Sequence, residues 1–204
     1  MSIHPLLNDE QDSESVGGKL HQEKEFSKLN LPKKQTVRAE FYKCKFISCN
    51  LFQSKFIECD FENCTFESCD MSLAAFENSR LLDVSFIKTK LVGFEWTKLR
   101  NPSRYSFKEC KLDGSNFFKV NIQQLHMINC SARECDFTEA NLSKGEFSGT
   151  DFLGSRFGQT NLSFADFSDA LNYAIDPNKN KLKKTVFTQP EVTTLLNYFD
   201  IVIK

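Results

Sequence analysis

A large apolar side chain, most often phenylalanine, recurs at every fifth position through most of this chain. An α-helix repeats a face about every 3.6 residues and a β-strand about every 2, so neither keeps a five-residue period on one side. A chain that turns a corner once per repeat does keep it, and such a chain winds into a solenoid. Two runs of residues follow this five-residue spacing. The second extends from Phe107 to Phe167. The first consists of Phe41, Phe46, Leu51, Phe56, Phe61, Phe66, Met71, Phe76, Leu81, Phe86, Leu91 and Trp96.

A second register of small residues lies two positions before the large ones. All eight cysteines of the chain belong to it, together with alanine, serine, threonine and glycine. Extended backbone places residues two apart on the same side, so we expect the small and the large residue to point inward. The other three positions of each repeat then face water.

The cysteines admit three interpretations: a disulfide framework, a zinc site, or small buried residues. A zinc site usually needs a cysteine pair with partner ligands elsewhere. The positions of Cys59, Cys64 and Cys69 are instead filled by serine, alanine or threonine in equivalent repeats. A cytosolic protein also keeps its thiols reduced. The pattern favours reduced, buried cysteines that act as small apolar side chains.

Composition limits the classes of partner. The 26 Lys and Arg residues nearly cancel the 27 Asp and Glu residues, which argues against direct nucleic-acid binding by a polybasic surface. No apolar run approaches the roughly 20 residues that span a bilayer. The segment Met1 to Glu25 is polar and lacks the apolar centre of a secretory signal. We therefore expect no membrane association and a cytoplasmic location.

No catalytic motif is evident. The sequence lacks a G-x-S-x-G element, a P-loop, a dinucleotide fingerprint and an H-E-x-x-H pair. We expect His4 and His21 in a flexible N-terminal segment, and His126 exposed to solvent without a base or metal beside it. The prediction is a non-enzymatic protein with no catalytic residue, no cofactor and no metal.

Short motifs in the second run carry a family resemblance. Ala140-Asn141-Leu142, Thr150-Asp151-Phe152 and Ala165-Asp166-Phe167 are similar to the repeats of pentapeptide-repeat proteins. That resemblance implies an all-β fold, a right-handed quadrilateral parallel β-helix with four repeats per coil, in which successive coils stack about 4.8 Å apart. We expect a flexible segment over 1–25, the β-helix over 26–187, and a cap of one short helix and one strand over 188–204.

The period is interrupted in two places. Phe94 puts a large ring in the small register beside Trp96, and an extra residue follows within the stretch 97–106. This stretch is expected to leave the coil as a small basic loop, and its candidate contact residues are Lys98, Arg100 and Arg104. Later, Asn172 and Pro177 fall where large apolar residues belong, which predicts a distorted turn over 173–184.

The C-terminus has the features of a cap. Thr188 and Glu191 are spaced as a capping box that opens a helix. An apolar stripe of Val192, Leu195, Leu196 and Phe199 follows, and then Ile201 to Ile203 as a short strand. This apolar surface can cover the end of one solenoid, or it can cover the end and also join two solenoids in a dimer. The resemblance to pentapeptide-repeat proteins directed at DNA gyrase implies the second, a homodimer.

One outward face of the second run is acidic. Sorting outward residues by their place in the coil gathers Glu109, Glu146, Asp166 and Asp169 against Lys108. Glu146 and Asp166 are twenty residues apart and are expected to stack about 4.8 Å from each other. The cluster is either an ordinary solvated surface or a strip that imitates the regularly spaced phosphates of DNA.

Two functions remain open at this point. The C-terminal pattern and the interruption resemble the quinolone-resistance and microcin-immunity branch of the family. That resemblance implies a protein that binds DNA gyrase or topoisomerase IV and protects it from poisons. The alternative is a general interaction scaffold or bacterial effector with an unrelated partner.

Overall fold

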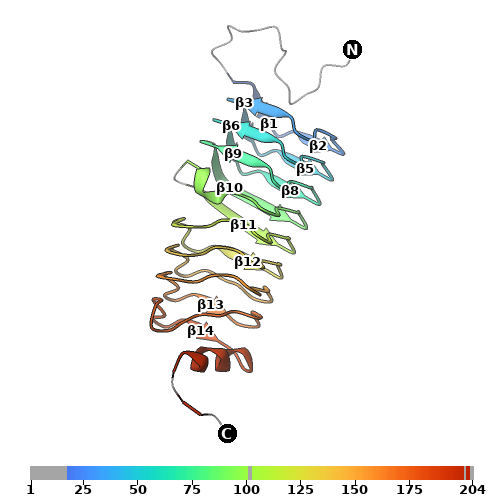
Figure 1. Ribbon diagram of the computed structural model, residues 1–204. Helices are drawn as coiled ribbons and strands as arrows, with labels where there is room; N and C mark the ends of the chain where they lie inside the picture. The colour runs from blue at the N-terminus through green and yellow to red at the C-terminus, as the bar shows by residue number, and fades with distance from the viewer. Residues whose placement is uncertain (1–17, 101–102, 200, 203–204) are drawn as a thin grey trace.

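The computed structural model describes residues 18–100, 103–199 and 201–202, which wind into a β-solenoid of about eight turns. The turns stack along one axis, with β1 (Leu20–Gln22) near one end and the helix η2 (Glu191–Tyr198) at the other (Figure 1). With about 4.8 Å per turn, the stack is roughly 38 Å long. The predicted parallel β-helix is confirmed.

Short parallel strands form the faces of the solenoid. Most pair with the strand one turn away, and β10 runs through a corner and so joins two faces in one sheet. Isolated bridges continue the same stacking where no named strand is present. The remaining elements are β2 (Glu25–Ser27), β3 (Gln35–Val37), β4 (Glu40–Tyr42), β5 (Lys45–Ile47), β6 (Lys55–Ile57), β7 (Asp60–Glu62), β8 (Thr65–Glu67), β9 (Ala75–Glu77), β10 (Arg80–Ile87), η1 (Trp96–Lys98), β11 (Arg104–Lys108), β12 (His126–Ile128), β13 (Asp166–Phe167) and β14 (Val186–Phe187).

Equivalent rings lie directly above one another. The pairing of β5 with β8 sets Phe46 opposite Phe66, and their rings stack with centroids 4.5 Å apart. Phe117 and Phe137 stack in the same way at 4.9 Å in the second half. Because the strands are parallel and in register, every turn places its large side chain on the one before it. The interior is therefore a set of continuous apolar columns.

The small side chains that lie two positions before the large ones are buried, and many of them also donate hydrogen bonds to the backbone. Ser54 Oγ donates a hydrogen bond to the carbonyl oxygen of Leu31 at 2.6 Å, and Thr89 Oγ1 donates to that of Phe66 at 3.0 Å. Cysteines occupy the same place, since Cys44 Sγ donates to the carbonyl oxygen of His21 at 3.3 Å. These side chains are small enough for the interior and still satisfy a backbone acceptor one turn away.

The cysteine prediction is confirmed, because all eight are buried and free. Burial raises the pKa of Cys59 to about 11 and that of Cys135 to about 12. Both thiols therefore stay protonated at neutral pH and resist oxidation and metal binding.

Each corner is made by a residue with left-handed backbone. The position two after the large residue has φ near +55°, as at Glu58 (54°), Asn63 (53°) and Leu73 (55°). Glycine takes this conformation without steric cost and does so at Gly93 and Gly114. At the other corners an ordinary side chain is held there by the hydrogen bonds of the neighbouring turns.

The solenoid begins earlier than the predicted boundary at residue 26. Strand β1 pairs with β4, and His21 lies opposite Phe41 with its ring stacked at 4.9 Å. The prediction that His21 belongs to a flexible segment was therefore wrong. It failed because His21 and Thr36 occupy inward positions without being large apolar residues. Residues 1–17 of that predicted segment lie outside the described part.

The stacking is locally irregular in the last turns. Tyr173 and Ile175 are buried in place of the mismatched Asn172 and Pro177, and Ile175 bridges to Phe157. The chain then returns to register, with Phe187 opposite Phe167 in the pair β13–β14.

The predicted capping box is absent. Helix η2 is a 3-10 helix with Pro190 at its N-cap and no side-chain capping bond. Thr188 Oγ1 instead accepts a hydrogen bond from the Asp169 backbone N–H at 3.0 Å, which fastens the start of the cap to the preceding turn. Ile201 and Val202 form no strand, and Ile203 lies outside the described residues.

Candidate protein-interaction surfaces

The predicted acidic face occupies two columns of one side of the solenoid. Bridges from His126 to Glu146 and from Glu146 to Asp166 place these three residues in one column. Glu109 and Asp169 belong to a second column, and Asn129 and Gly149 occupy the same position in the two turns between them. The structure thus brings Glu146, Asp166 and Asp169 together over adjacent turns and leaves Glu109 apart.

Two carboxylates of this face have side-chain partners in the neighbouring turn. Lys88 Nζ lies 3.7 Å from Glu109 Oε2, and His126 Nδ1 lies 2.8 Å from Glu146 Oε2. Asp166 accepts a hydrogen bond from the Ser168 N–H at 2.8 Å and has no ion pair with a described residue. The expectation that His126 has no partner was wrong, because its parallel neighbour in the next turn is a glutamate.

Ion pairs between adjacent turns are common elsewhere on the rod. Arg38 pairs with Glu58 at 2.8 Å and Arg156 with Asp136 at 2.8 Å, each one turn away. Such exposed pairs contribute little to stability, typically below about 1 kcal/mol. They do, however, cancel the field of the carboxylates, so the long-range attraction of this surface for a cationic partner is weak.

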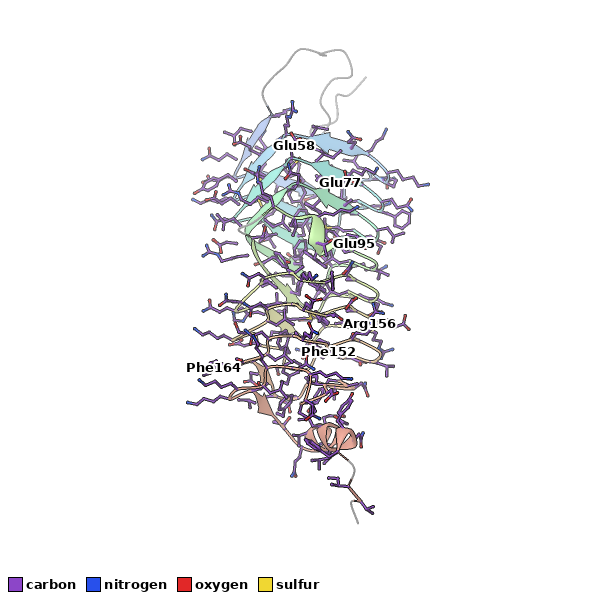
Figure 2. The ribbon with its side chains drawn as sticks, turned by 60° about the vertical axis from the view of Figure 1, so that its left-hand side comes forward. Glu58, Glu77, Glu95, Phe152, Arg156 and Phe164 are labelled. Atoms are coloured by element: carbon purple, nitrogen blue, oxygen red, sulfur yellow. The ribbon has the colours of Figure 1, made fainter. Side chains whose placement is uncertain are left out.

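A second set of carboxylates was missed at the sequence level. Glu58, Glu77 and Glu95 follow one another down the half of the rod that holds the N-terminal turns (Figure 2). Glu77 and Glu95 form no ion pair with any residue in the described part of the chain. Sorting the first run by coil position, as was done for the second, would have found them.

The predicted basic loop is held more tightly than expected on both sides of residues 101–102, which lie outside the described part. Arg100 N donates to the Ser79 carbonyl at 2.8 Å, and β11 begins at Arg104. The Arg100 guanidinium contacts Asp60. Arg104 forms a two-point pair with Asp83, from Nε at 2.9 Å and Nη2 at 2.7 Å.

Lys98 is the predicted loop cation that remains available. It lies at the end of η1, is exposed, and forms no ion pair with a residue the structure describes. The two arginines are occupied in fixing the insertion to the acidic residues of earlier turns.

The C-terminal cap both covers the core and exposes apolar surface. Leu195 packs against the core cluster, and Val192 is half-buried. Leu196, Phe199 and Ile201 are exposed. Figure 1 shows η2 beneath the last turns, at the extreme end of the rod. One side of the predicted stripe therefore closes the solenoid, and the other side is free to contact a second molecule.

The described part of the chain has neither a cluster of metal-ligating side chains nor a membrane-spanning helix. No group of three or more His, Cys, Asp or Glu side chains within this part of the chain is arranged to hold a metal ion. None of the helices described is long and apolar enough to cross a bilayer. His4 lies outside the described residues.

Solved structures with the same architecture cover most of the chain. Two trypsin-treated variants of QnrB1, a plasmid-mediated fluoroquinolone resistance protein, match 92% and 88% of this chain and 99% and 100% of their own, with TM-scores of 0.60 and 0.64 and 17% identity. HetL, a pentapeptide-repeat protein involved in heterocyst differentiation regulation in the cyanobacterium Nostoc, matches 84% of this chain and 86% of its own, with a TM-score of 0.68 and 14% identity. At these identities the likeness shows the fold alone.

Sequence comparison identifies the family. No curated protein matches the chain significantly. The family model for the pentapeptide repeat region matches residues 39–103 and 101–171, two segments that meet at the interruption after η1. Together they cover most of the solenoid, and the chain belongs to the pentapeptide-repeat family.

Proposed function

We propose that this protein is a non-enzymatic binding protein that protects a type II topoisomerase, DNA gyrase or topoisomerase IV, from poisons such as quinolones or microcins. The observation that carries the proposal is a filled rod on which Glu146 and Asp166 stack in adjacent turns. Duplex DNA also presents regularly spaced negative groups along a rod. The fold shared with QnrB1, a fluoroquinolone resistance protein, supports the same assignment.

The charge balance shapes how such a protein binds. The net charge is −1 and many carboxylates are paired, so attraction over long distances contributes little. Affinity then rests on shape, on the unpaired carboxylates and on Lys98 beside the interruption. A topoisomerase partner also requires that the protein reside in the cytoplasm.

A homodimer joined through the C-terminal cap is part of the proposal. The exposed Leu196, Phe199 and Ile201 are large apolar side chains grouped at one end of the rod. Grouped apolar side chains of this kind mark contact surfaces. We expect the protein to have twice the chain mass in solution and the double variant Leu196→Ser, Phe199→Ser to be monomeric. A monomeric unaltered protein would contradict the dimer.

A supercoiling assay tests the function. Gyrase is inhibited with a fixed amount of fluoroquinolone, and the protein is added over a wide concentration range. We expect supercoiling to be restored as the protein is added. Unchanged inhibition throughout the range, with the protein folded by circular dichroism, would refute the proposal for that drug and enzyme, and microcin and topoisomerase IV are tested in the same way.

A pair of charge variants tests the surface. The double variant Glu146→Lys, Asp166→Lys reverses the stacked carboxylates, and we expect it to lose protection. The control Glu23→Lys, Glu139→Lys makes the same change in net charge at carboxylates that are already paired with Lys43 and Lys119 on other faces. Equal loss in both variants would show that total charge matters rather than this column.

The alternative is a scaffold with an unrelated partner. HetL shares the fold at least as closely as QnrB1 and is involved in a regulatory process. Affinity capture from the native host distinguishes the two cases. Recovery of another stable partner without any topoisomerase favours the scaffold.

A further inference from the structure

One face of the C-terminal half of the rod carries lysines and no carboxylate. This lysine face consists of the outward positions beside Ile122, Leu142, Leu162 and Leu182, in four successive turns that the structure describes throughout. Asparagine, glutamine, serine and one phenylalanine fill its uncharged positions, and its charged residues are Lys144, Lys181, Lys183 and Lys184. Every other face of these turns includes at least one Asp or Glu residue.

The four lysines are exposed, and none forms an ion pair with a residue in the described part of the chain. On other faces lysines have a glutamate one turn away, since Lys88 lies 3.7 Å from Glu109 and Lys119 lies 3.4 Å from Glu139. Like charges set close together on a sheet surface are unfavourable. The uncompensated charge of the lysine face is therefore a cost that an anionic partner would offset.

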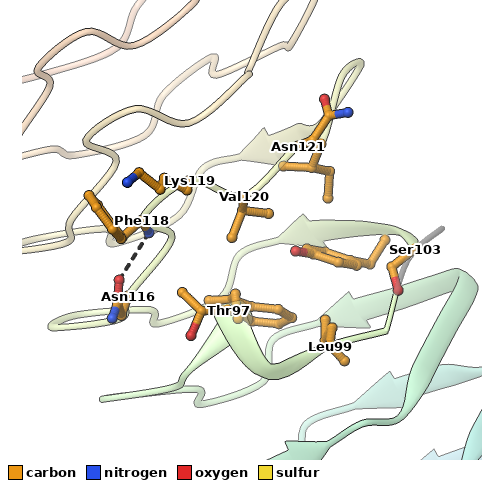
Figure 3. A pocket seen from close by; sticks show the side chains of 11 residues that line it. Thr97, Leu99, Ser103, Asn116, Phe118, Lys119, Val120 and Asn121 are labelled. Atoms are coloured by element: carbon orange, nitrogen blue, oxygen red, sulfur yellow. Dashed lines mark hydrogen bonds between the residues drawn. The ribbon is translucent and has the colours of Figure 1, made fainter.

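A hydrogen-bonded column of asparagines forms one edge of the lysine face. Asn121 stands at the first of these turns, beside the interruption after η1 (Figure 3). Asn141 Nδ2 donates to Asn121 Oδ1 at 2.9 Å, and Asn161 Nδ2 donates to Asn141 Oδ1 at 3.0 Å. Lys181 follows in the same column. Because this edge is already ordered, a partner that binds here immobilises few side chains of the rod.

Lys144, Phe164 and Lys184 form the other edge, at a corner of the coil. Their backbone is left-handed, with φ of 61°, 62° and 53°. The Phe164 N–H donates to the Lys183 carbonyl at 2.8 Å, which fixes the corner to the next turn. The Phe164 ring is exposed and projects from the rod (Figure 2), with the Lys183 ammonium 5.9 Å from its centre. This edge offers a ligand both positive charge and an apolar surface.

The dimensions of the lysine face match an extended peptide. Its four turns rise about 14 Å from first to last, and the face is about 10 Å wide. Carboxylates lie beyond both edges, with Glu139 on one side and Glu146 and Asp166 on the other. A DNA duplex carries phosphates on two strands and would set some of them against these carboxylates. A single extended peptide stays within the strip.

We propose that the lysine face binds an extended acidic segment of a protein partner, laid along the axis of the rod. Carboxylates of this segment pair with Lys144, Lys183 and Lys184, and the methylene groups of its acidic side chains pack on Phe164. The stacked Glu146 and Asp166 belong to the neighbouring face. Binding at the lysine face therefore goes beyond the topoisomerase proposal and does not depend on it.

Fluorescence anisotropy with the full-length protein tests the proposal. The probe is a rhodamine-labelled peptide of alternating Glu and Gly, about 12 residues long, in which extended backbone sets every carboxylate on one side. We expect saturable binding with one site per chain at about 25 mM salt, and a Kd at least about fivefold higher at about 300 mM, since salt screens exposed charges. The uncharged peptide of alternating Gln and Gly should not bind.

Two charge variants locate the site. We expect Lys144→Glu, Lys184→Glu to raise the Kd for the peptide at least about fivefold, because two attractive contacts become repulsive. The control is Lys90→Glu, Lys111→Glu, which makes the same change in net charge two corners away, at lysines 3.9 Å from Asp70 and 3.5 Å from Asp113. This control should bind within about twofold of the unaltered protein, since its charges are distant and screened.

Side-chain amide signals in a ¹H–¹⁵N spectrum give a second measure of location. We expect those of Asn141 and Asn161 to shift as the peptide is added. The Asn50 signal, from a similar pair with Asn30 on another face, should stay in place.

Several results would overturn the proposal. They are no binding of the peptide at low salt, an equal loss of affinity in the two charge variants, and shifts at Asn50 as large as those at Asn141. Tighter binding of single-stranded oligothymidylate, or of phosphatidylserine vesicles, than of the peptide would assign the face to nucleic acid or to a lipid surface instead. All four substituted lysines are exposed, and circular dichroism verifies that each variant is folded.

Discussion

Replacing one interior ring tests the packing most directly, and Phe66→Ala is the most informative choice. Phe66 is 0% exposed and lies in the middle of a continuous column. Its ring stacks on Phe46 at 4.5 Å on one side and on Phe86 at 5.2 Å on the other. Removing it leaves Phe46 and Phe86 each with a stacked ring on one side only, and the parallel backbone ladder cannot collapse to fill the space.

We expect Phe66→Ala to lower the free energy of unfolding by about 4–5 kcal/mol. Truncation of a buried phenylalanine costs about 3–5 kcal/mol. The upper part of that range applies because each lost stacked pair is worth about 0.5–1.5 kcal/mol beyond its buried area. The measurement is urea unfolding followed by circular dichroism and by the fluorescence of the single tryptophan.

The matched control is Phe164→Ala. Phe164 is 46% exposed and projects from the rod in Figure 2, and the Lys183 ammonium lies 5.9 Å from the centre of its ring. Its removal should cost less than about 1 kcal/mol. Equal losses at the two positions, or a loss below about 2 kcal/mol at Phe66, would refute the stacked-column account.

Three further predictions concern corners, protonation and thiols. Leu73→Asn should stabilise the protein by about 0.5–1 kcal/mol in urea unfolding, because asparagine tolerates left-handed backbone better than leucine; Leu153→Asn, at an exposed position without positive φ, should have almost no effect. Burial, with Lys24 and Lys19 nearby, lowers the pKa of His21 to about 4. Between pH 6.5 and 4 this imidazole is protonated in the unfolded chain and neutral in the folded chain. The free energy of unfolding should therefore fall as the pH is lowered from 6.5 to 4. His21→Phe should weaken this dependence in hydrogen exchange of the first turn, and an identical profile would contradict the assignment. Native protein should react negligibly with a thiol reagent at pH 8, and unfolded protein should expose all eight thiols.

The regular part of the fold could be predicted because every repeat needs one large apolar side chain and one small side chain in the interior. A phenylalanine that recurs at a fixed interval of five, such as Phe46 or Phe66, indicates the large inward position. The small residue two positions earlier indicates the second inward position. The first turn was missed because His21 stands where the pattern calls for a large apolar residue. Stacking on Phe41 makes the imidazole acceptable there, and that contact is visible only in three dimensions.

The irregular parts of the fold could not be predicted, because they depend on contacts between residues far apart in the sequence. Tyr105 was assigned to a protruding loop, yet it is buried against Trp96 because the bulge in β10 turns it inward. Thr188 has the sequence signature of a capping residue but binds the Asp169 N–H instead. The candidate acidic face was visible from spacing alone, whereas the contacts of its carboxylates with Lys88 and His126 required the register between turns.

The one-turn offset that hydrogen-bonded residues share through the regular turns has an evolutionary consequence. Since regular turns meet their neighbours through the same parallel pattern, such a turn can be duplicated or deleted without creating a new kind of junction. The distance from the interruption after η1 to the C-terminal cap can therefore change only in increments of about 4.8 Å. Proteins descended from such a gene would differ in the length of the rod by whole turns, and a partner that contacts both places would favour one particular number of turns.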